Sequence, residues 1–107
     1  LLPAAGDGHS WHIFAPLLPL DRVDLSRAQF MKAMHERGIG VGVHYPALHL
    51  FSTYRKLGYE EGDFPNAERI GRETVTLPLF PAMLPSDVDR VCDAVSDILR
   101  AAKKGHR

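Results

Sequence analysis

The stretch Gly38-Ile39-Gly40-Val41-Gly42-Val43-His44-Tyr45-Pro46-Ala47-Leu48-His49 is the most informative part of this sequence. Glycine at every second position removes the side chains from one face of an extended segment, while Val41 and Val43 keep the other face apolar. A ligand or another part of the backbone can therefore approach closely. The run ends in two histidines and a tyrosine, which can exchange hydrogen bonds with a ligand. The pattern predicts a short strand that leads into a binding site.

A helix is expected immediately before this segment, over residues 25–37. Its apolar positions recur at three- and four-residue spacing, which gives the helix one broad buried face. Asp24 is the expected N-cap, since a short side-chain oxygen can accept a bond from the first free N–H groups. Gly38 is the expected stop, because glycine readily takes the left-handed conformation that ends many helices.

The part that follows is expected to be irregular at first. Residues 46–65 contain aromatic residues and glycines without a clear period, which predicts a long loop with one helical turn near residues 52–56. A short helix is expected over residues 66–72. A strand is expected over residues 74–77, where β-branched residues precede Pro78.

Two further elements are expected nearer the ends of the chain. Residues 10–20 open with aromatic and apolar side chains that predict a strand. Pro16 and Pro19 place this strand at an edge, because proline cannot donate to a ladder of hydrogen bonds. The clearest element is a helix over residues 85–102, whose apolar side chains lie three and four positions apart.

The expected order is strand, helix, strand, loop with a short helix, strand, helix. Helices that cover one face of a short antiparallel or mixed sheet form a two-layer α+β domain. We expect residues 10–107 to form one such domain. Residues 1–9, which are rich in glycine and small side chains, are expected to be a flexible lead-in.

The composition excludes several classes of protein. Thirteen Lys and Arg residues balance thirteen Asp and Glu residues, so the chain has no net charge that would favour nucleic acid or an anionic membrane as a partner. No apolar run is long enough to span a membrane. Cys92 is the only cysteine, so no disulfide can form within the chain, and a reducing cytoplasm is the expected location.

Three side chains at the end of the glycine segment are candidates for a binding site. His44 and His49 can donate or accept hydrogen bonds, and Tyr45 adds a hydroxyl and an apolar ring. The alternative is that Tyr45 packs beneath the loop and both histidines simply face solvent. The residue pattern alone leaves both interpretations open.

The other reactive residues do not form a self-contained active site. The histidines lack the cysteine pairs or the His-Glu-x-x-His spacing typical of zinc, so no metal site is expected. Cys92 falls on the apolar face of the last expected helix and is interpreted as a small buried hydrophobic residue. Gly38-x-Gly40-x-Gly42 is not a dinucleotide-binding fingerprint, because no helix opens after it. Phe80, between two prolines, is expected from its spacing to fill the core.

Several blocks of sequence together resemble one family. They are Trp11-His12-Ile13-Phe14, Gly38 to His49, Tyr54-Arg55, Gly62 to Arg69, Thr76 to Pro81 and Asp87 to Val91. The second block is close to GIGTGVHYPPLH and the fifth matches TLPLFP, both from the C-terminal small domain of the DegT/DnrJ/EryC1/StrS aminotransferases. That family consists of sugar aminotransferases of fold type I that depend on pyridoxal 5'-phosphate (PLP). The blocks occur in the family's order and cover nearly the whole chain.

The resemblance implies that the chain is the C-terminal, substrate-side domain of a homodimeric enzyme. The enzyme would transfer an amino group from an amino acid, usually glutamate, to a keto-sugar nucleotide. In the family, a lysine and an acidic residue on the large domain of the same polypeptide hold the PLP. The lysines of this chain, which are Lys32, Lys56, Lys103 and Lys104, do not have that context. We therefore expect no catalytic or cofactor-binding residue here, and no activity of the chain alone.

By position, the resemblance carries a substrate-binding role to His44, Tyr45 and His49. Tyr54 and Phe80 are secondary candidates for the same role. Each of these assignments comes from the family pattern and not from the residue spacing.

The sequence departs from the family pattern at Val41, Ala47 and Leu84, where threonine, proline and a Ser/Thr helix cap are usual. Because leucine has no capping oxygen, Pro85 and Asp87 must start the last helix without one.

Two other functions remain open, a free-standing ligand-binding or regulatory α+β module and an interaction domain that pairs with a separate large-domain chain. A lysine and an acidic residue encoded upstream would favour the enzyme.

Overall fold

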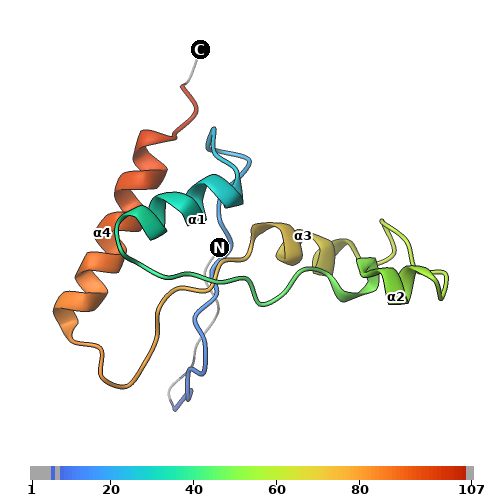
Figure 1. Ribbon diagram of the computed structural model, residues 1–107, viewed down its shortest axis with the longest axis horizontal. Helices are drawn as coiled ribbons and strands as arrows, with labels where there is room; N and C mark the ends of the chain where they lie inside the picture. The colour runs from blue at the N-terminus through green and yellow to red at the C-terminus, as the bar shows by residue number, and fades with distance from the viewer. Residues whose placement is uncertain (1–5, 7, 106–107) are drawn as a thin grey trace.

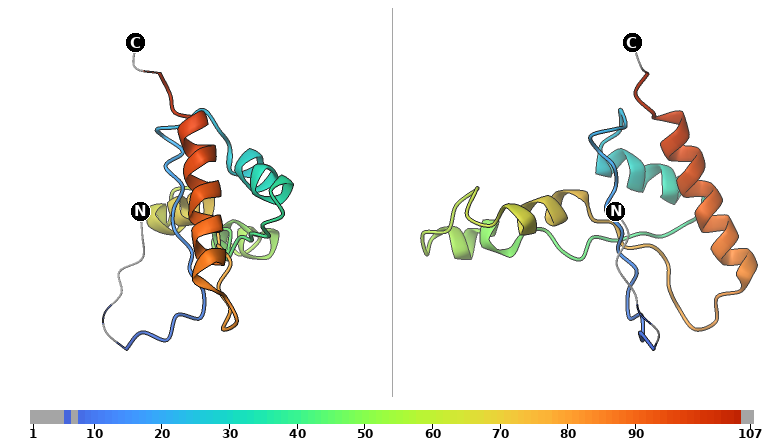
Figure 2. Two further views of the ribbon diagram at one scale, coloured as in Figure 1. Left: turned by 90° about the vertical axis from the view of Figure 1, so that its left-hand side faces the viewer. Right: turned by 180° about the vertical axis from the view of Figure 1, so that it is seen from behind.

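The structure, a computed structural model, describes residue 6 and residues 8–105. Its elements are α1 (Arg27–Glu36), the 3-10 helix η1 (Leu48–Leu50), α2 (Ser52–Arg55), α3 (Pro65–Glu73) and α4 (Pro85–Ala101). We call residues 46–73 the arm, because η1, α2 and α3 extend away from α1 and α4 (Figure 1). The other described residues form the body, in which α1 and α4 are in contact. Figure 2, right, shows the same division from behind.

The helix expected before the glycine segment is present as α1, but it starts later than predicted. Ser26, not Asp24, is the N-cap. Its hydroxyl accepts the N–H of Gln29 at 3.2 Å, and the Gln29 side chain accepts the N–H of Ser26 at 2.8 Å. Asp24 instead donates its backbone N–H to the carbonyl of Ala102. The predicted stop at Gly38 is confirmed by its φ of 72°, in the left-handed region.

α4 confirms the prediction of a long amphipathic helix near the C-terminal end. The helix begins at Pro85, and the Asp87 carboxylate accepts the N–H of Leu84 at 2.9 Å. The carboxylate therefore satisfies the N–H of the N-cap residue, whereas the N–H of Asp87, which would donate to a hydroxyl cap, bonds to the Leu84 carbonyl at 2.9 Å. The buried stripe of α4 consists of Val91, Ala94 and Ile98.

The apolar face of α4 is wider than the core that it covers. Cys92 is exposed, so the prediction that it is a buried residue is wrong. Val88, one turn earlier, is 46% exposed. Helical spacing indicates which side chains are apolar neighbours, but it does not indicate how much of that face the body covers.

One hydrophobic core holds the body together. Phe30 and Met34 from α1 and Val75 from the segment after α3 are fully buried. They pack with Leu18, Ile39, Val91, Ala94 and Ile98. Burying a large apolar side chain contributes about 1.5–3 kcal/mol, so the three central side chains alone stabilise the body substantially.

The expected β-sheet is absent from the described residues, and the prediction of a two-layer α+β domain is wrong. The three segments predicted as strands are extended and meet only at isolated bridges, Phe14 with Leu77, Leu17 with Thr74 and Gly42 with Thr76. A continuous ladder does not form because Pro16 and Pro19 have no N–H to donate and Pro78 ends the central segment. Residues 74–77 still lie between the other two segments, at the centre of the body.

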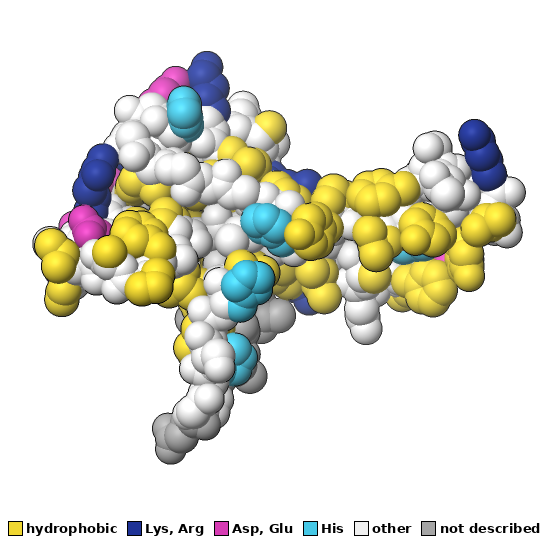
Figure 3. Space-filling model, turned by 60° about the horizontal axis from the view of Figure 1, so that its bottom comes forward, with side chains coloured by type: hydrophobic (Ala, Val, Ile, Leu, Met, Phe, Trp, Pro, Cys, Tyr) yellow, Lys and Arg dark blue, Asp and Glu magenta, His cyan; other side chains and the backbone are white. Residues whose placement is uncertain are grey.

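The arm gives the molecule an open shape. The radius of gyration is 15.8 Å, whereas a compact domain of this length has about 13 Å. The turn predicted near residues 52–56 is confirmed as α2, and the helix predicted over residues 66–72 is confirmed as α3. Figure 3 shows hydrophobic side chains along the arm, and the exposed ones are Leu48, Phe51, Tyr54, Leu57, Tyr59, Phe64 and Ile70. The arm therefore leaves much of its apolar surface uncovered.

The N-terminal residues are described only in part. Of the expected lead-in, residues 1–5 and 7 lie outside the described residues. Within the described part, the His9 ring accepts the N–H of Trp11 at 2.8 Å, and the two rings lie 4.3 Å apart. None of the described helices is long and apolar enough to cross a bilayer.

Candidate functional site

The glycine segment leads into a bend that is fastened to residue 76. The N–H of Gly42 donates to the carbonyl of Thr76 at 3.1 Å, and the N–H of Thr76 donates to the carbonyl of Gly42 at 2.7 Å. The bend itself consists of His44 and Tyr45, which are joined by a cis peptide bond. This pair of backbone bonds holds the start of the bend against the centre of the body.

The His44 ring folds back over Gly42. A Cβ at position 42 would lie 3.3 Å from Cε1 of His44, closer than ordinary contact, so glycine leaves room for the ring. Nδ1 of His44 lies 2.8 Å from Oγ1 of Thr76. Nε2 has no hydrogen-bond partner among the described residues. One ring nitrogen is therefore held by the protein, and the other has no described partner on an exposed side chain.

Tyr45 does not pack beneath the loop, which was the alternative left open by the sequence. Its side chain is 66% exposed. The Tyr45 ring packs edge-on against the His44 ring, with centroids 4.9 Å apart and planes at 86°. The two residues form an open corner with a free imidazole nitrogen and a phenol hydroxyl.

His49 is enclosed by the arm. It is 8% exposed and faces Glu68, which is 4% exposed, with Nε2 3.3 Å from Oε2. The separation suits an ion pair, although Nε2 makes no well-aligned hydrogen bond. The Phe64 ring packs edge-on against the imidazole at 4.9 Å. The described contacts of His49 are thus with the interior of the arm.

Glu68 is a residue that the sequence reasoning missed. Its carboxylate accepts the backbone N–H of Gly62 at 2.9 Å and of Phe64 at 3.1 Å. The bond from Gly62, together with that from Phe64 and the nearby His49, holds the pKa of Glu68 below its ordinary value of 4.5, although burial acts in the opposite direction. The carboxylate therefore fastens the loop before α3 to the helix. An acidic residue in the first turn of a helix was the available signal.

Gly71 allows close packing within the arm and Arg27 joins the arm to the body, and the sequence reasoning missed both. A Cβ at Gly71 would lie 2.5 Å from the nitrogen of Ala47 and 3.2 Å from the carbonyl carbon of Pro46. Only glycine therefore allows α3 to lie against the backbone that follows the bend. Nη1 of Arg27 donates to the carbonyls of Gly71 and Thr74, which satisfies carbonyls at the end of α3. A glycine within an expected helix was the signal, because it lowers helix stability unless close packing requires it.

Tyr54 and Phe80 lie in two other places. Tyr54 is on α2, 40% exposed, and its ring lies 6.4 Å from that of Tyr59. Phe80 lies in the turn before α4 and is 51% exposed, so the expectation that it fills the core is wrong. It lines a surface hollow together with Trp11 and His12. The five predicted site residues thus fall into three groups, at the bend, in the arm and in the body.

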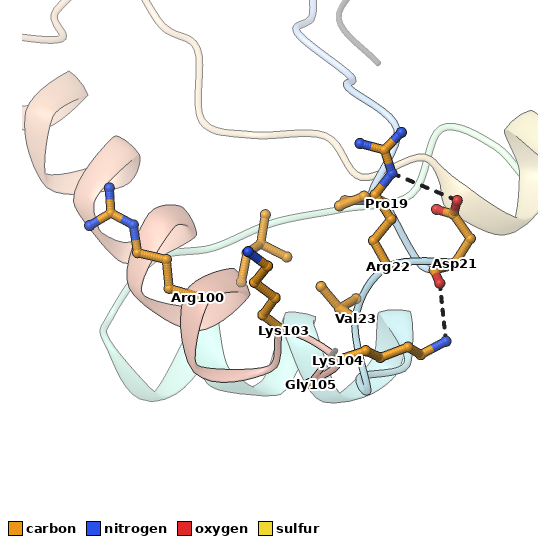
Figure 4. Close-up of a pocket in the computed structure, with 9 residues that line it drawn as sticks. Pro19, Asp21, Arg22, Val23, Arg100, Lys103, Lys104 and Gly105 are labelled. Atoms are coloured by element: carbon orange, nitrogen blue, oxygen red, sulfur yellow. Dashed lines mark hydrogen bonds and ion pairs between the residues drawn. The ribbon is translucent and has the colours of Figure 1, made fainter. Parts of the chain in front are cut away.

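A large cavity of about 800 Å³ lies elsewhere, at the C-terminal end of α4. Its lining includes Arg22, Arg100, Lys103 and Lys104. Figure 4 shows the charged ends of these side chains lying apart from one another, and both Arg22 and Lys104 have a partner in Asp21, at its carboxylate and its carbonyl respectively. Because the charges do not converge, this cavity is not arranged as an anion site.

The bend does not carry the groups that hold a metal ion or PLP. No three His, Cys, Asp or Glu side chains in this part of the chain are placed to share a metal. PLP enzymes need a lysine amine and a charged partner for the ring nitrogen of the cofactor. All four lysines are exposed and lie in α1, after α2 and after α4. The residues at the bend therefore do not fit PLP by themselves.

Comparison with curated proteins gives clear matches. A model of the DegT/DnrJ/EryC1/StrS aminotransferase family matches residues 2–96. An uncharacterized protein of Methanocaldococcus jannaschii is 40% identical over 92 residues, 85% of this chain and 24% of its own length. The spore coat polysaccharide biosynthesis protein SpsC of Bacillus subtilis is 38% identical over 96 residues, 88% of this chain and 25% of its own length. The chain thus spans about a quarter of the length of these relatives.

Solved structures agree with this assignment. The DesV protein of S. venezuelae, in complex with a ketimine intermediate, is 32% identical, with a TM-score of 0.75. The match covers 92% of this chain and 26% of the DesV chain. The aminotransferase TlmJ from Streptoalloteichus hindustanus is 31% identical, with a TM-score of 0.72. The match covers 92% of this chain and 25% of the TlmJ chain. The putative sugar aminotransferase Spr1654 from Streptococcus pneumoniae, in its apo form, has a TM-score of 0.80. The match covers 94% of this chain and 26% of the Spr1654 chain. At 22% identity it supports the fold alone.

Proposed function

Because this chain belongs to the DegT/DnrJ/EryC1/StrS aminotransferase family, we propose that it is the C-terminal, substrate-side domain of a PLP-dependent sugar aminotransferase. In the proposed reaction the complete enzyme transfers an amino group from an amino acid, glutamate in the first instance, to a keto-sugar nucleotide. The observation that carries the proposal is a family match over residues 2–96 in a chain that spans a quarter of its relatives. The name of the Bacillus relative, a spore coat polysaccharide biosynthesis protein, supports a sugar as the acceptor.

In this proposal His44 and Tyr45 contact the sugar substrate. Nε2 of His44 and the hydroxyl of Tyr45 are accessible, and both can bond to hydroxyl or phosphate oxygens. His49 acts indirectly, because its pairing with Glu68 keeps the arm folded beside the bend. Tyr54 and Phe80 remain secondary candidates, since both rings are exposed and can meet a ligand that extends beyond the bend.

The proposed partner is the large PLP-binding domain of the same polypeptide, and two such polypeptides form a homodimer. The exposed hydrophobic surface of the arm supports a covering domain, because a surface of this kind is unfavourable in water. The catalytic lysine and PLP belong to that domain, so this chain alone is inactive. A single cysteine suits a reducing cytoplasm as the location of the enzyme.

Absorbance spectroscopy and an amino-transfer assay test the proposal. We expect the complete enzyme, incubated with PLP, to show a visible Schiff-base band that disappears when glutamate is added. The 107-residue chain should show neither that band nor glutamate-dependent amino transfer. A Schiff base on the chain alone would contradict the assignment of the lysine to another domain.

The coding sequence upstream of Leu1 provides a second, independent test. The proposal expects that sequence to encode a PLP-binding domain with a lysine and an acidic residue for the cofactor. A start codon directly before Leu1 would instead favour a free-standing module or a separate large-domain partner.

A further inference from the structure

We infer that Thr76 is a positioning residue for His44, which holds Nδ1 of the imidazole and so presents Nε2 to an oxygen atom of the ligand. The identity of that ligand, a sugar nucleotide, rests on the proposed function. The hold of Thr76 on the ring rests on the geometry of the bend alone.

The His44 ring is restrained on three sides. Oγ1 of Thr76 lies 2.8 Å from Nδ1. Gly42 lies under the ring, where a Cβ would come within 3.3 Å of Cε1. Tyr45 packs edge-on against the ring. These contacts leave Nε2 as the ring nitrogen without a partner among the described residues.

Thr76 is itself fixed in place. Its backbone exchanges both hydrogen bonds with Gly42, and its neighbour Val75 is fully buried in the core. The next residue, Leu77, donates its N–H to the carbonyl of Phe14 at 3.0 Å. Threonine is also restricted at χ1 because its Cβ is branched. The hydroxyl therefore has a defined position relative to the bend.

A hydroxyl suits both charge states of the imidazole. Toward a neutral ring the hydroxyl can donate to Nδ1 or accept from Nδ1–H, and the proposed role requires the first arrangement, in which the ring proton is on Nε2. Toward a charged ring, Thr76 accepts a bond from Nδ1–H, and Nε2 again carries a proton. In that arrangement, and in the charged state, Nε2–H is a donor, which fits a sugar hydroxyl or a diphosphate oxygen.

Matched substitutions in the complete enzyme test this role. Thr76→Val keeps the shape of the side chain and the backbone bonds but removes the hydroxyl. We expect it to raise KM for the sugar nucleotide about fivefold, the value of one hydrogen bond, with kcat little changed. The half-reaction with glutamate, which involves no sugar, should be unaffected. Thr76→Ser should restore KM to within about twofold, because it returns the hydroxyl.

Thr53→Val is the matched control, since Thr53 is exposed on α2. It should leave both half-reactions unchanged. If Thr76→Val does not fold, as judged by circular dichroism, Thr76→Ala is measured in its place. An unchanged KM in the hydroxyl-free variant, or equal losses in the glutamate half-reaction, would overturn the inference.

Nitrogen NMR of histidine-labelled protein separates this inference from the proposed function. The resonance of His44 is assigned by its absence in His44→Gln. In the wild type we expect the neutral ring to carry its proton on Nε2, and this preference should weaken in Thr76→Val and return in Thr76→Ser. An enzyme without sugar aminotransferase activity would contradict the proposed function, whereas a His44 signal that does not respond to the substitutions would contradict the role of Thr76.

Discussion

Replacing Gly71 by alanine places a methyl group where α3 lies against the first residues of the arm. The new Cβ would lie 2.5 Å from the nitrogen of Ala47, 3.2 Å from the carbonyl carbon of Pro46 and 3.3 Å from Cα of Ala47. All three are backbone atoms, so no side chain can rotate away. Ordinary contact begins at 3.4 Å, and the helix and the loop must therefore separate by about 0.9 Å.

Two opposing effects decide the outcome. Alanine stabilises a helix interior by about 1 kcal/mol relative to glycine. Overpacking against atoms that cannot yield costs about 1–3 kcal/mol. Separation of α3 from the loop also disturbs the bond from Arg27 to the Gly71 carbonyl, which costs about 1 kcal/mol more. We expect a net loss of about 2 kcal/mol in the free energy of unfolding.

Urea denaturation of the wild type and the variant checks this value. With an m-value of about 2 kcal/mol/M, the urea midpoint should fall by about 1 M. Gly40→Ala is the control, because a Cβ added at Gly40 would have no atom within 4 Å, and it should be neutral or stabilising by up to about 1 kcal/mol. A midpoint for Gly71→Ala at or above that of the wild type would refute the close contact between α3 and the loop.

Three further predictions concern Glu68, Arg27 and His44. The folded-state pKa of Glu68 lies below 4.5, so its ionised carboxylate stabilises the chain above that pH and the contribution is lost as pH falls through the folded-state pKa. The urea midpoint of Glu68→Gln should thus be lower than that of the wild type at neutral pH, and the two midpoints should converge in acid. A difference between the midpoints that is the same at every pH would contradict this. Arg27→Ala should cost about 2 kcal/mol, because carbonyls at the end of α3 lose a charged donor. Arg22→Ala, at an exposed pair of 3.9 Å, should cost less than about 0.5 kcal/mol in the same denaturation assay, and equal effects would disprove the difference. In the complete enzyme, His44→Ala should raise KM for the sugar nucleotide about tenfold with PLP still bound, and unchanged kinetics would remove His44 from the site.

Elements with a strong local signal were predictable from the sequence. The spacing of apolar residues identified α4, and Gly38 identified the end of α1, because both depend on neighbours along the chain. The start of α1 was predicted wrongly because Asp24 and Ser26 are both good caps. Gln29, which completes a capping box with Ser26, decides between them.

The sheet and much of the site depended on distant contacts that no local pattern reveals. Residues 10–20 have the composition of a strand, but pairing requires N–H groups that Pro16 and Pro19 lack. His44 and Tyr45 were identified because they follow the glycine segment directly. The partner of His49 is Glu68, in a different helix, and the family pattern alone did not indicate that His49 is buried against it.

The contact between Arg27 and Gly71 also has a consequence for the newly made chain. The two residues are 44 positions apart, so the arm cannot dock on α1 until the end of α3 has been synthesised. At about 5–20 residues per second, this interval lasts roughly 2–9 seconds. Phe51, the first aromatic residue of the arm, is made 20 residues before Gly71 and so waits roughly 1–4 seconds at that rate for the anchor that ties α3 to the body. Cotranslational aggregation, and protection by chaperones, should therefore depend on the aromatic side chains between residues 51 and 64.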